Sequence, residues 1–151
     1  MITLDTSAIF ALLNRADPDH GAIKAVVLEE RGPFLVPAGI MAEIGYLVEE
    51  RLGTRVLSAF LDDVLAGNFM LVCNEESFLR VRDLVNRYAD LPLGFSDAAV
   101  IACAETHGGR VLTLDVRDFS VVAKEGLIQV FPETVDTPKF RAPAKRPRAV
   151  K

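Results

Sequence analysis

The feature that most constrains the fold of this chain is a series of short apolar runs separated by longer amphipathic stretches. Each run has the length of a strand and is nearly continuous in apolar residues, as in strands whose two faces are both buried. The runs are residues 2–4, 34–36, 70–73, 111–114 and 127–131. Strands that alternate with helices form a parallel sheet with helices on both faces. We therefore predict an α/β fold, a three-layer sandwich around a central, mainly parallel sheet of about five strands.

The stretches between the runs have the apolar spacing of amphipathic helices. Helices are predicted from Thr6, from Asp17 to Gly32, over 38–52, 55–66 and 75–89, and from Ser96 to about His107. Ser96 is the expected cap of the last of these helices. The helix over 75–89 is expected to turn Phe78 and Leu79 toward the core.

Charge divides the chain into a body and a tail. The 151 residues fit one domain, and the half that are hydrophobic can build a core without disulfides. Residues 1–136 contain 11 basic and 21 acidic residues, a net charge of −10, which argues against a protein that grips nucleic acid by bulk positive charge. Residues 137–151 carry six basic residues, three prolines and no acid. We predict one domain over 1–136 and a basic arm over 137–151 that binds RNA, docks on the acidic body or is a passive tail.

The two cysteines and the N-terminus argue against several classes of protein. Cys73 and Cys103 lie in apolar runs and are expected to be small core residues. Neither has a CxxC neighbour, so no zinc site or redox pair is predicted. The chain begins MITLDTS, without a basic segment before an apolar stretch, and its apolar runs are too short to cross a bilayer. We therefore expect a soluble, cytoplasmic protein without a membrane partner.

Two of the predicted strands end in an aspartate. Asp5 follows the run at 2–4, and Asp115 follows the run at 111–114. The carboxyl ends of parallel strands share one edge of the sheet, where the sites of open α/β folds gather. Each aspartate alone could be a helix cap or a turn residue. Two of them on one edge favour a functional site.

Two further acids border the apolar faces of predicted helices. Glu43 lies four residues before Leu47, and Asp97 lies three residues before Val100. Each side chain is therefore beside a buried stripe and is not aimed squarely at water. The ordinary alternatives are an edge Glu paired with Arg in the first case, and a favourable interaction with the helix dipole in the second.

A cluster of these four carboxylates would need a cation. Like charges repel, and burial adds to the cost of ionising each group. Oxygen ligands without His or Cys suit hard ions such as Mg²⁺ or Mn²⁺. An ion of this kind can activate a water and stabilise the charge of a phosphodiester transition state. The residues favour a Mg²⁺ site at Asp5, Glu43, Asp97 and Asp115, with Mn²⁺ as the other candidate ion.

The segments that carry these acids resemble the motifs of PIN-domain nucleases, particularly the VapC-type toxins of toxin–antitoxin pairs. The segments are ITLDTSAIFALL, MAEI, LGFSDAAVIACA and VLTLDVRDF, spread between residue 1 and about residue 131. The resemblance implies a three-layer α/β fold and a metal-dependent endoribonuclease that hydrolyses the phosphodiester bonds of RNA. By position, it makes Asp5, Glu43, Asp97 and Asp115 the catalytic, metal-binding quartet.

The resemblance also implies supporting residues and partners. Thr6 or Ser7, together with Thr113, would be hydroxyls near the quartet, and Asp118 would be a fifth acid or a turn cap. The family implies a homodimer, with exposed apolar residues around 47–61 as the candidate contact. It also implies inhibition by a cognate antitoxin, whose C-terminal segment occupies the groove of the toxin.

Other classes compete with this interpretation. A phosphatase of the haloacid-dehalogenase type needs a second Asp two residues after the first, and that position is Ser7. A receiver domain needs a phosphorylatable Asp at the end of the third strand, where this chain has Cys73 and Asn74. An RNA-processing nuclease outside a toxin pair and a catalytically silent binding module with the same fold stay open. Binding of Mn²⁺ at the acidic edge would separate a nuclease from a silent module.

Overall fold

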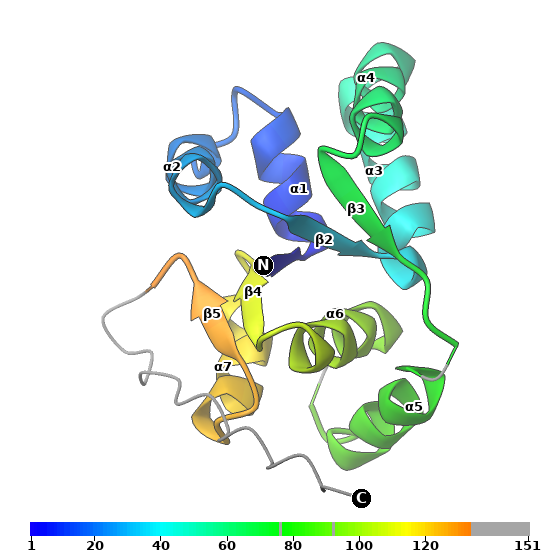
Figure 1. The fold of residues 1–151 in the computed structure, drawn as a ribbon, viewed down its shortest axis with the longest axis vertical. Helices are drawn as coiled ribbons and strands as arrows, with labels where there is room; N and C mark the ends of the chain where they lie inside the picture. Colours follow the sequence, from blue (N-terminus) through cyan, green and yellow to red (C-terminus); the bar gives the residue numbers. More distant parts are fainter. Residues whose placement is uncertain (76, 92, 134–151) are drawn as a thin grey trace, which may run out of the picture.

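Five parallel strands form the centre of the molecule, in the order β3-β2-β1-β4-β5 (Figure 1). The computed structural model describes residues 1–75, 77–91 and 93–133, so the predicted arm at 137–151 lies outside the described residues. The strands are β1 (Ile2–Leu4), β2 (Phe34–Pro37), β3 (Phe69–Val72), β4 (Arg110–Leu112) and β5 (Gln129–Phe131). Every neighbouring pair is parallel. The predicted α/β class and the number of strands are confirmed.

Helices cover both faces of this sheet. Within the described residues they are α1 (Thr6–Leu13), α2 (His20–Glu30), the 3₁₀ turn η1 (Ala38–Ile40), α3 (Met41–Leu52), α4 (Thr54–Leu65), α5 (Ser77–Arg87), α6 (Phe95–Thr106) and α7 (Val116–Lys124). Figure 1 shows α1 to α4 on one side of the sheet and α5 to α7 on the other. The predicted three layers are therefore present.

The order of the strands places a topological switch point between β1 and β4. The chain builds the sheet outward from β1 to β2 and β3, and then returns to place β4 and β5 on the other side of β1. Since crossovers between parallel strands are right-handed, the helices that follow β1 and β4 leave toward opposite faces. Ligands bind at the carboxyl ends of the strands at such a switch point. Asp5 and the residues after Leu112 lie at this position.

The helix α7 was not among the predicted elements. Residues 116–124 form it between β4 and β5, and Asp115 caps its N-terminus. Phe119, Val122 and Ala123 are buried along one of its faces. This spacing is that of a short amphipathic helix, so the sequence did contain the signal.

The helix α5 lies at the periphery, and this corrects an expectation about its side chains. Val81 and Leu84 are buried, but Phe78 and Leu79 are 56% and 64% exposed. The helix packs mainly on α6, so only a narrow stripe of it is covered. Phe78 and Leu79 therefore do not belong to the core.

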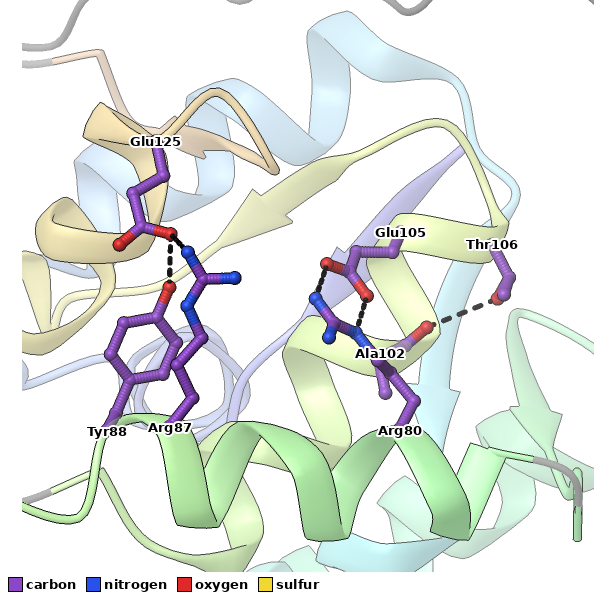
Figure 2. A network of polar contacts seen from close by, with 7 residues as sticks. All are labelled: Arg80, Arg87, Tyr88, Ala102, Glu105, Thr106 and Glu125. Carbon is purple, nitrogen blue, oxygen red and sulfur yellow. Dashed lines mark hydrogen bonds and ion pairs between the residues drawn. The ribbon is translucent and has the colours of Figure 1, made fainter.

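Ion pairs and a hydrogen bond connect α5 and the residue after it to α6 and to the end of α7, as Figure 2 shows. Arg80 donates from Nε and Nη2 to the two carboxylate oxygens of Glu105 on α6, both over 2.7 Å. These hydrogen bonds raise the pKa of Arg80 above its ordinary value. Near the other end of α5, Arg87 and the hydroxyl of Tyr88 donate to Glu125, which follows α7. Burial and then the bond to Glu125 raise the pKa of Tyr88 to about 12.

We expect the pair between Arg80 and Glu105 to contribute measurably to stability. Arg80→Met keeps the apolar stem and removes the guanidinium, which should lower the free energy of unfolding by about 1 kcal/mol because the pair is bidentate and partly buried. Arg82→Met is the matched control, since Arg82 and its partner Asp83 are both more than half exposed. Equal urea-unfolding midpoints for the two variants would contradict this assignment.

Of the two cysteines predicted to lie in the core, one is buried and the other is exposed. Cys103 is buried on α6, as predicted, and burial raises the pKa of its thiol. The core assignment of Cys73 is wrong, because Cys73 follows the edge strand β3 and is exposed. None of the helices in the described part of the chain is long and apolar enough to span a bilayer.

Candidate active site

Asp5 is the centre of a hydrogen-bond network at the carboxyl end of β1. Its side chain caps α1 by accepting from the backbone N–H of Ser7 at Oδ2, over 3.3 Å. The hydroxyls of Ser7 and Thr113 donate to the same oxygen over 2.6 and 2.8 Å. Among the described residues, every hydrogen bond to this carboxylate ends on Oδ2. Asp5 Oδ1 is therefore left for an external ligand.

The two hydroxyls are themselves fixed by the backbone that follows β4. The N–H of Leu114 donates to Ser7 Oγ, and the N–H of Asp115 donates to Thr113 Oγ1, each over 2.9 Å. A hydroxyl has one proton, so each of these groups accepts from the backbone and gives its proton to Asp5. The network thus joins β1 to β4 across the switch point and fixes the orientation of the Asp5 carboxylate.

The structure also distinguishes the two hydroxyls that follow Asp5. Ser7 belongs to the network, whereas Thr6 Oγ1 is buried and has no hydrogen-bond partner among the described residues. Of the two predicted alternatives, Ser7 is the residue that contacts the acid.

Asp97 lies in the first turn of α6, and the pKa of its carboxyl is shifted from the ordinary value. Its Oδ2 accepts from the backbone N–H of Gly94, the N-cap of the helix, over 3.1 Å. Burial raises the pKa of Asp97 to about 6; the hydrogen bond from Gly94 opposes this, and the charges of Asp5, Asp115 and Asp118 add to it. These carboxylates therefore lie close enough to repel one another.

The two acids after β4, Asp115 and Asp118, differ in burial and in hydrogen-bond partners. Asp115 is exposed and caps α7, accepting from the backbone N–H of Asp118 at Oδ1 over 3.4 Å. Asp118 is buried and accepts from Nε of Arg117 over 3.1 Å. Asp115 is thus the cap of this turn, and Asp118 adds a negative charge near Asp97. Its position three residues after Asp115 was the signal in the sequence.

Glu43 is connected to the site by a hydrogen bond from Ser96. It lies in the first turn of α3 and accepts a short hydrogen bond from the hydroxyl of Ser96 on α6. Ser96 was predicted to cap α6, but Gly94 is the N-cap and the helix begins at Phe95. The hydroxyl of Ser96 therefore links two helices, and Glu43 is connected to the residue that precedes Asp97.

The donor chemistry of this edge suits a hard divalent cation. The groups are carboxylates and hydroxyls, no hydrogen bond from a described residue ends on Asp5 Oδ1, and Asp97 has negative charges nearby that a cation would offset. Within the described residues, however, no three acidic, His or Cys side chains are arranged to hold an ion as they stand. Binding would have to draw the carboxylates together, so the metal centre stays a prediction.

Comparison with known proteins gives the family. The PIN domain model matches residues 2–125. The chain is 32% identical to the ribonuclease VapC26 of Mycobacterium tuberculosis over 125 residues. This match covers 82% of this chain and 93% of that protein. The match covers β1 to α7 and includes all four predicted acids.

Solved structures agree on the fold. VapC20 of Mycobacterium tuberculosis, a Sarcin–Ricin loop cleaving toxin, superposes with a TM-score of 0.70 at 23% identity, over 81% of this chain and 95% of that one. A toxin–antitoxin complex from Klebsiella pneumoniae gives a TM-score of 0.58 at 18% identity, over 80% of this chain and 91% of that one. FitAcB from Neisseria gonorrhoeae gives a TM-score of 0.56 at 19% identity, over 87% of this chain and 96% of that one. With the family model matching most of its length, this chain belongs to the PIN-domain family.

Proposed function

We propose that this protein is a Mg²⁺-dependent endoribonuclease whose metal-binding acids are Asp5, Glu43, Asp97 and Asp115. The observation that carries the proposal is the hydrogen-bond network that orients the Asp5 carboxylate at the switch point of the sheet. Burial and the charges of Asp5, Asp115 and Asp118, which raise the pKa of Asp97, add support. The relative at 32% identity is a ribonuclease, and a structural neighbour is a toxin that cleaves the Sarcin–Ricin loop.

The residues divide into ligands and groups that orient them. Asp5 would offer Oδ1, since Oδ2 is taken by the hydroxyls of Ser7 and Thr113. Asp97 would approach from the first turn of α6 and Asp115 from the N-cap of α7, and Glu43 would be directed from α3 by Ser96. When bound, a divalent ion supplies an activated water and charge stabilisation for phosphodiester hydrolysis. The Mn²⁺ ion suits the same ligands.

The acidic site also explains why a cation would be needed for the substrate. A phosphodiester is an anion, and the carboxylates at this edge would repel it. An ion held between them and the phosphate removes this repulsion. RNA with an unpaired or looped segment is the expected substrate, because an unpaired backbone can approach the acids at the carboxyl edge of the sheet more closely than a duplex can.

We expect cleavage of single-stranded or looped RNA to depend fully on the divalent ion. Chelation with EDTA should abolish it, and excess Mg²⁺ or Mn²⁺ should restore it, because the carboxylates cannot activate a water without the ion. The measurement is the rate of appearance of RNA fragments on a denaturing gel. Equal rates with EDTA and with Mg²⁺ would contradict the metal mechanism, and a preparation of Asp5→Ala controls for a contaminating nuclease.

The proposed biological role is the toxin of a type II toxin–antitoxin pair. One structural neighbour is a toxin–antitoxin complex, which supports an antitoxin as the partner of this chain. A homodimer is also proposed, with exposed Leu61 and Tyr46 among the candidate contacts on α3 and α4. Inspection of the adjacent reading frame and light scattering of the purified protein test these two points.

A catalytically silent module is the second candidate. It is favoured by one observation: no three acidic side chains in the described part of the chain are placed to hold an ion as they stand. Titration with Mn²⁺, followed by its paramagnetic signal, separates the two proposals. Saturable binding that Asp97→Asn weakens supports the nuclease, and the absence of binding supports the silent module.

A further inference from the structure

We propose that the pocket between the carboxyl ends of β2 and β3 and the helices α5 and α6 receives a nucleobase of the bound RNA, with Phe78 and Phe95 as its stacking wall. The proposal rests on the proposed function and names the part of the substrate that this surface would hold. It assigns a role to two aromatic residues that the acidic site does not use.

The pocket lies at the carboxyl ends of β2 and β3, and one of its lining residues, Phe95, directly precedes Ser96, the hydrogen-bond partner of Glu43. It has a volume of about 240 Å³ and is lined on α6 by Phe95, Ala99, Cys103 and Thr106. At about 100° per residue these four positions share one side of the helix, Ser96 comes next around the helix, and Asp97 lies beyond it. The hydrogen bond between Ser96 and Glu43 therefore lies between the pocket and Asp97, and Glu43 is the acid next to the pocket. A nucleotide whose phosphate is at the acids could place its base in this pocket.

Two exposed phenylalanines form the wall of the pocket. Phe78 and Phe95 are 56% and 49% exposed, and their ring centroids are 6.3 Å apart with an angle of 23° between the planes. This spacing is too close for a base to enter between the rings, so a base would stack on the outer surface of the pair. Unpaired bases of RNA are commonly held on aromatic side chains in this way.

The small residue at position 39 allows Phe95 to take its place. A Cβ at Gly39 would lie 3.3 Å from Cε1 of Phe95 and 3.2 Å from the Cβ of Ala99. Both contacts are tighter than ordinary packing, so any larger residue would displace the ring or the helix. The absence of a side chain at Gly39 thus lets Phe95 pack against the turn before α3, and the wall exists before a ligand binds.

Size and charge select a base over a phosphate. The pocket is smaller than the roughly 300–1,000 Å³ of sites for drug-sized ligands, which suits a single flat ring system. None of the described residues that line it is Lys or Arg, so nothing there would attract a phosphate. Glu75 is the one charged residue among the described lining residues, and its carboxylate would repel a phosphate, so the pocket fits the uncharged part of a nucleotide.

The test compares variants at one position while cleavage is blocked. The probe is a short single-stranded oligouridylate with one 2-aminopurine, with Ca²⁺ in place of Mg²⁺. Phe78→Leu should weaken binding by about 5- to 150-fold, the range found when the aromatic side chain under one stacked base is removed. Phe78→Tyr keeps an aromatic ring and should bind RNA as the wild type does. Leu79→Ala is the control, because Leu79 is similarly exposed on α5 but does not line the pocket. Thermal unfolding of each variant checks the fold.

A second readout uses the thiol of Cys73, which is exposed and lines the same pocket. Bound RNA should slow the alkylation of Cys73 by iodoacetamide in the wild type and less so in Phe78→Leu. RNA binding with unchanged alkylation and equal affinities of the Phe78 variants would overturn this inference and leave the nuclease proposal standing. Absence of RNA binding by the wild type would overturn both. Protection of Cys73 by a co-expressed protein but not by RNA would make the pocket a protein-docking surface.

Discussion

Replacement of Asp97 by Asn should lower the rate of Mg²⁺-dependent RNA cleavage by more than about 100-fold, since loss of a mere supporting residue around a metal costs roughly 10- to 100-fold. The substitution keeps the shape of the side chain and the acceptor for the N–H of Gly94. It removes one negative charge from the group made with Asp5 and Asp115. The expected loss is therefore one of metal binding and not of folding.

The same substitution should stabilise the protein without metal. The pKa of Asp97 is about 6 in the fold, against 3.8 as its ordinary value. Between these two pH values the folded protein binds more protons than the unfolded chain, so the stability falls as the pH rises and stays low above about pH 7. Asn does not titrate and avoids this loss. We expect a gain of about 1 to 2 kcal/mol above pH 7, after allowing for solvent screening of a partly exposed group.

The two effects are measured together by urea unfolding across a pH series, with EDTA or with Mg²⁺. In EDTA, the advantage of Asp97→Asn should vanish as the pH falls below about 4, since Asp97 of the wild type is then protonated in both states. Added Mg²⁺ should stabilise the wild type and have little effect on the variant. Asp62→Asn, at an exposed position on α4, is the control. A variant that is less stable than the wild type at pH 7 in EDTA would contradict the electrostatic account.

Much of this site could be predicted because local sequence determines it. Asp5 and Asp115 directly follow apolar runs, and the carboxyl ends of parallel strands meet at one edge. The link between Glu43 and Ser96 could not be predicted, because it depends on how α3 and α6 approach each other across 53 positions of sequence. Nor does the sequence reveal which oxygen of Asp5 the hydroxyls of Ser7 and Thr113 use.

The errors in the predicted fold come from the edges of the molecule. A continuous apolar run predicts a strand with both faces buried, but β3 has a neighbour on one side only, so Met70 and Leu71 are half exposed and Cys73 is exposed. In the same way, α5 covers one helix and leaves Phe78 outside. Periodicity finds an apolar face, but the depth at which that face is buried depends on tertiary contacts that no local pattern contains.

Replacement of Thr113 by Val should damage both the fold and the activity, because the hydroxyl of Thr113 joins Asp5 to the backbone that follows β4. The residue is fully buried, and its Oγ1 donates to Asp5 and accepts from the backbone of Asp115. Val has nearly the same shape but leaves a buried carboxylate with one donor fewer and a backbone N–H without its acceptor. The expected cost is about 1 to 3 kcal/mol of stability. Cleavage should fall by about 10- to 100-fold, as for residues that orient a metal ligand.

Thr113→Ser separates the role of the hydroxyl from that of packing. Ser keeps the donor and the acceptor but removes a buried methyl group, so it should lose about 1 kcal/mol of stability and retain most of the cleavage rate. The Val variant should lose both stability and cleavage rate. Its affinity for Mn²⁺ should fall together with the cleavage rate, because a carboxylate that is not held in place binds the ion less well. Equal cleavage by the Val and Ser variants, measured below their unfolding temperatures, would mean that Thr113 only fills space and that Ser7 alone orients Asp5.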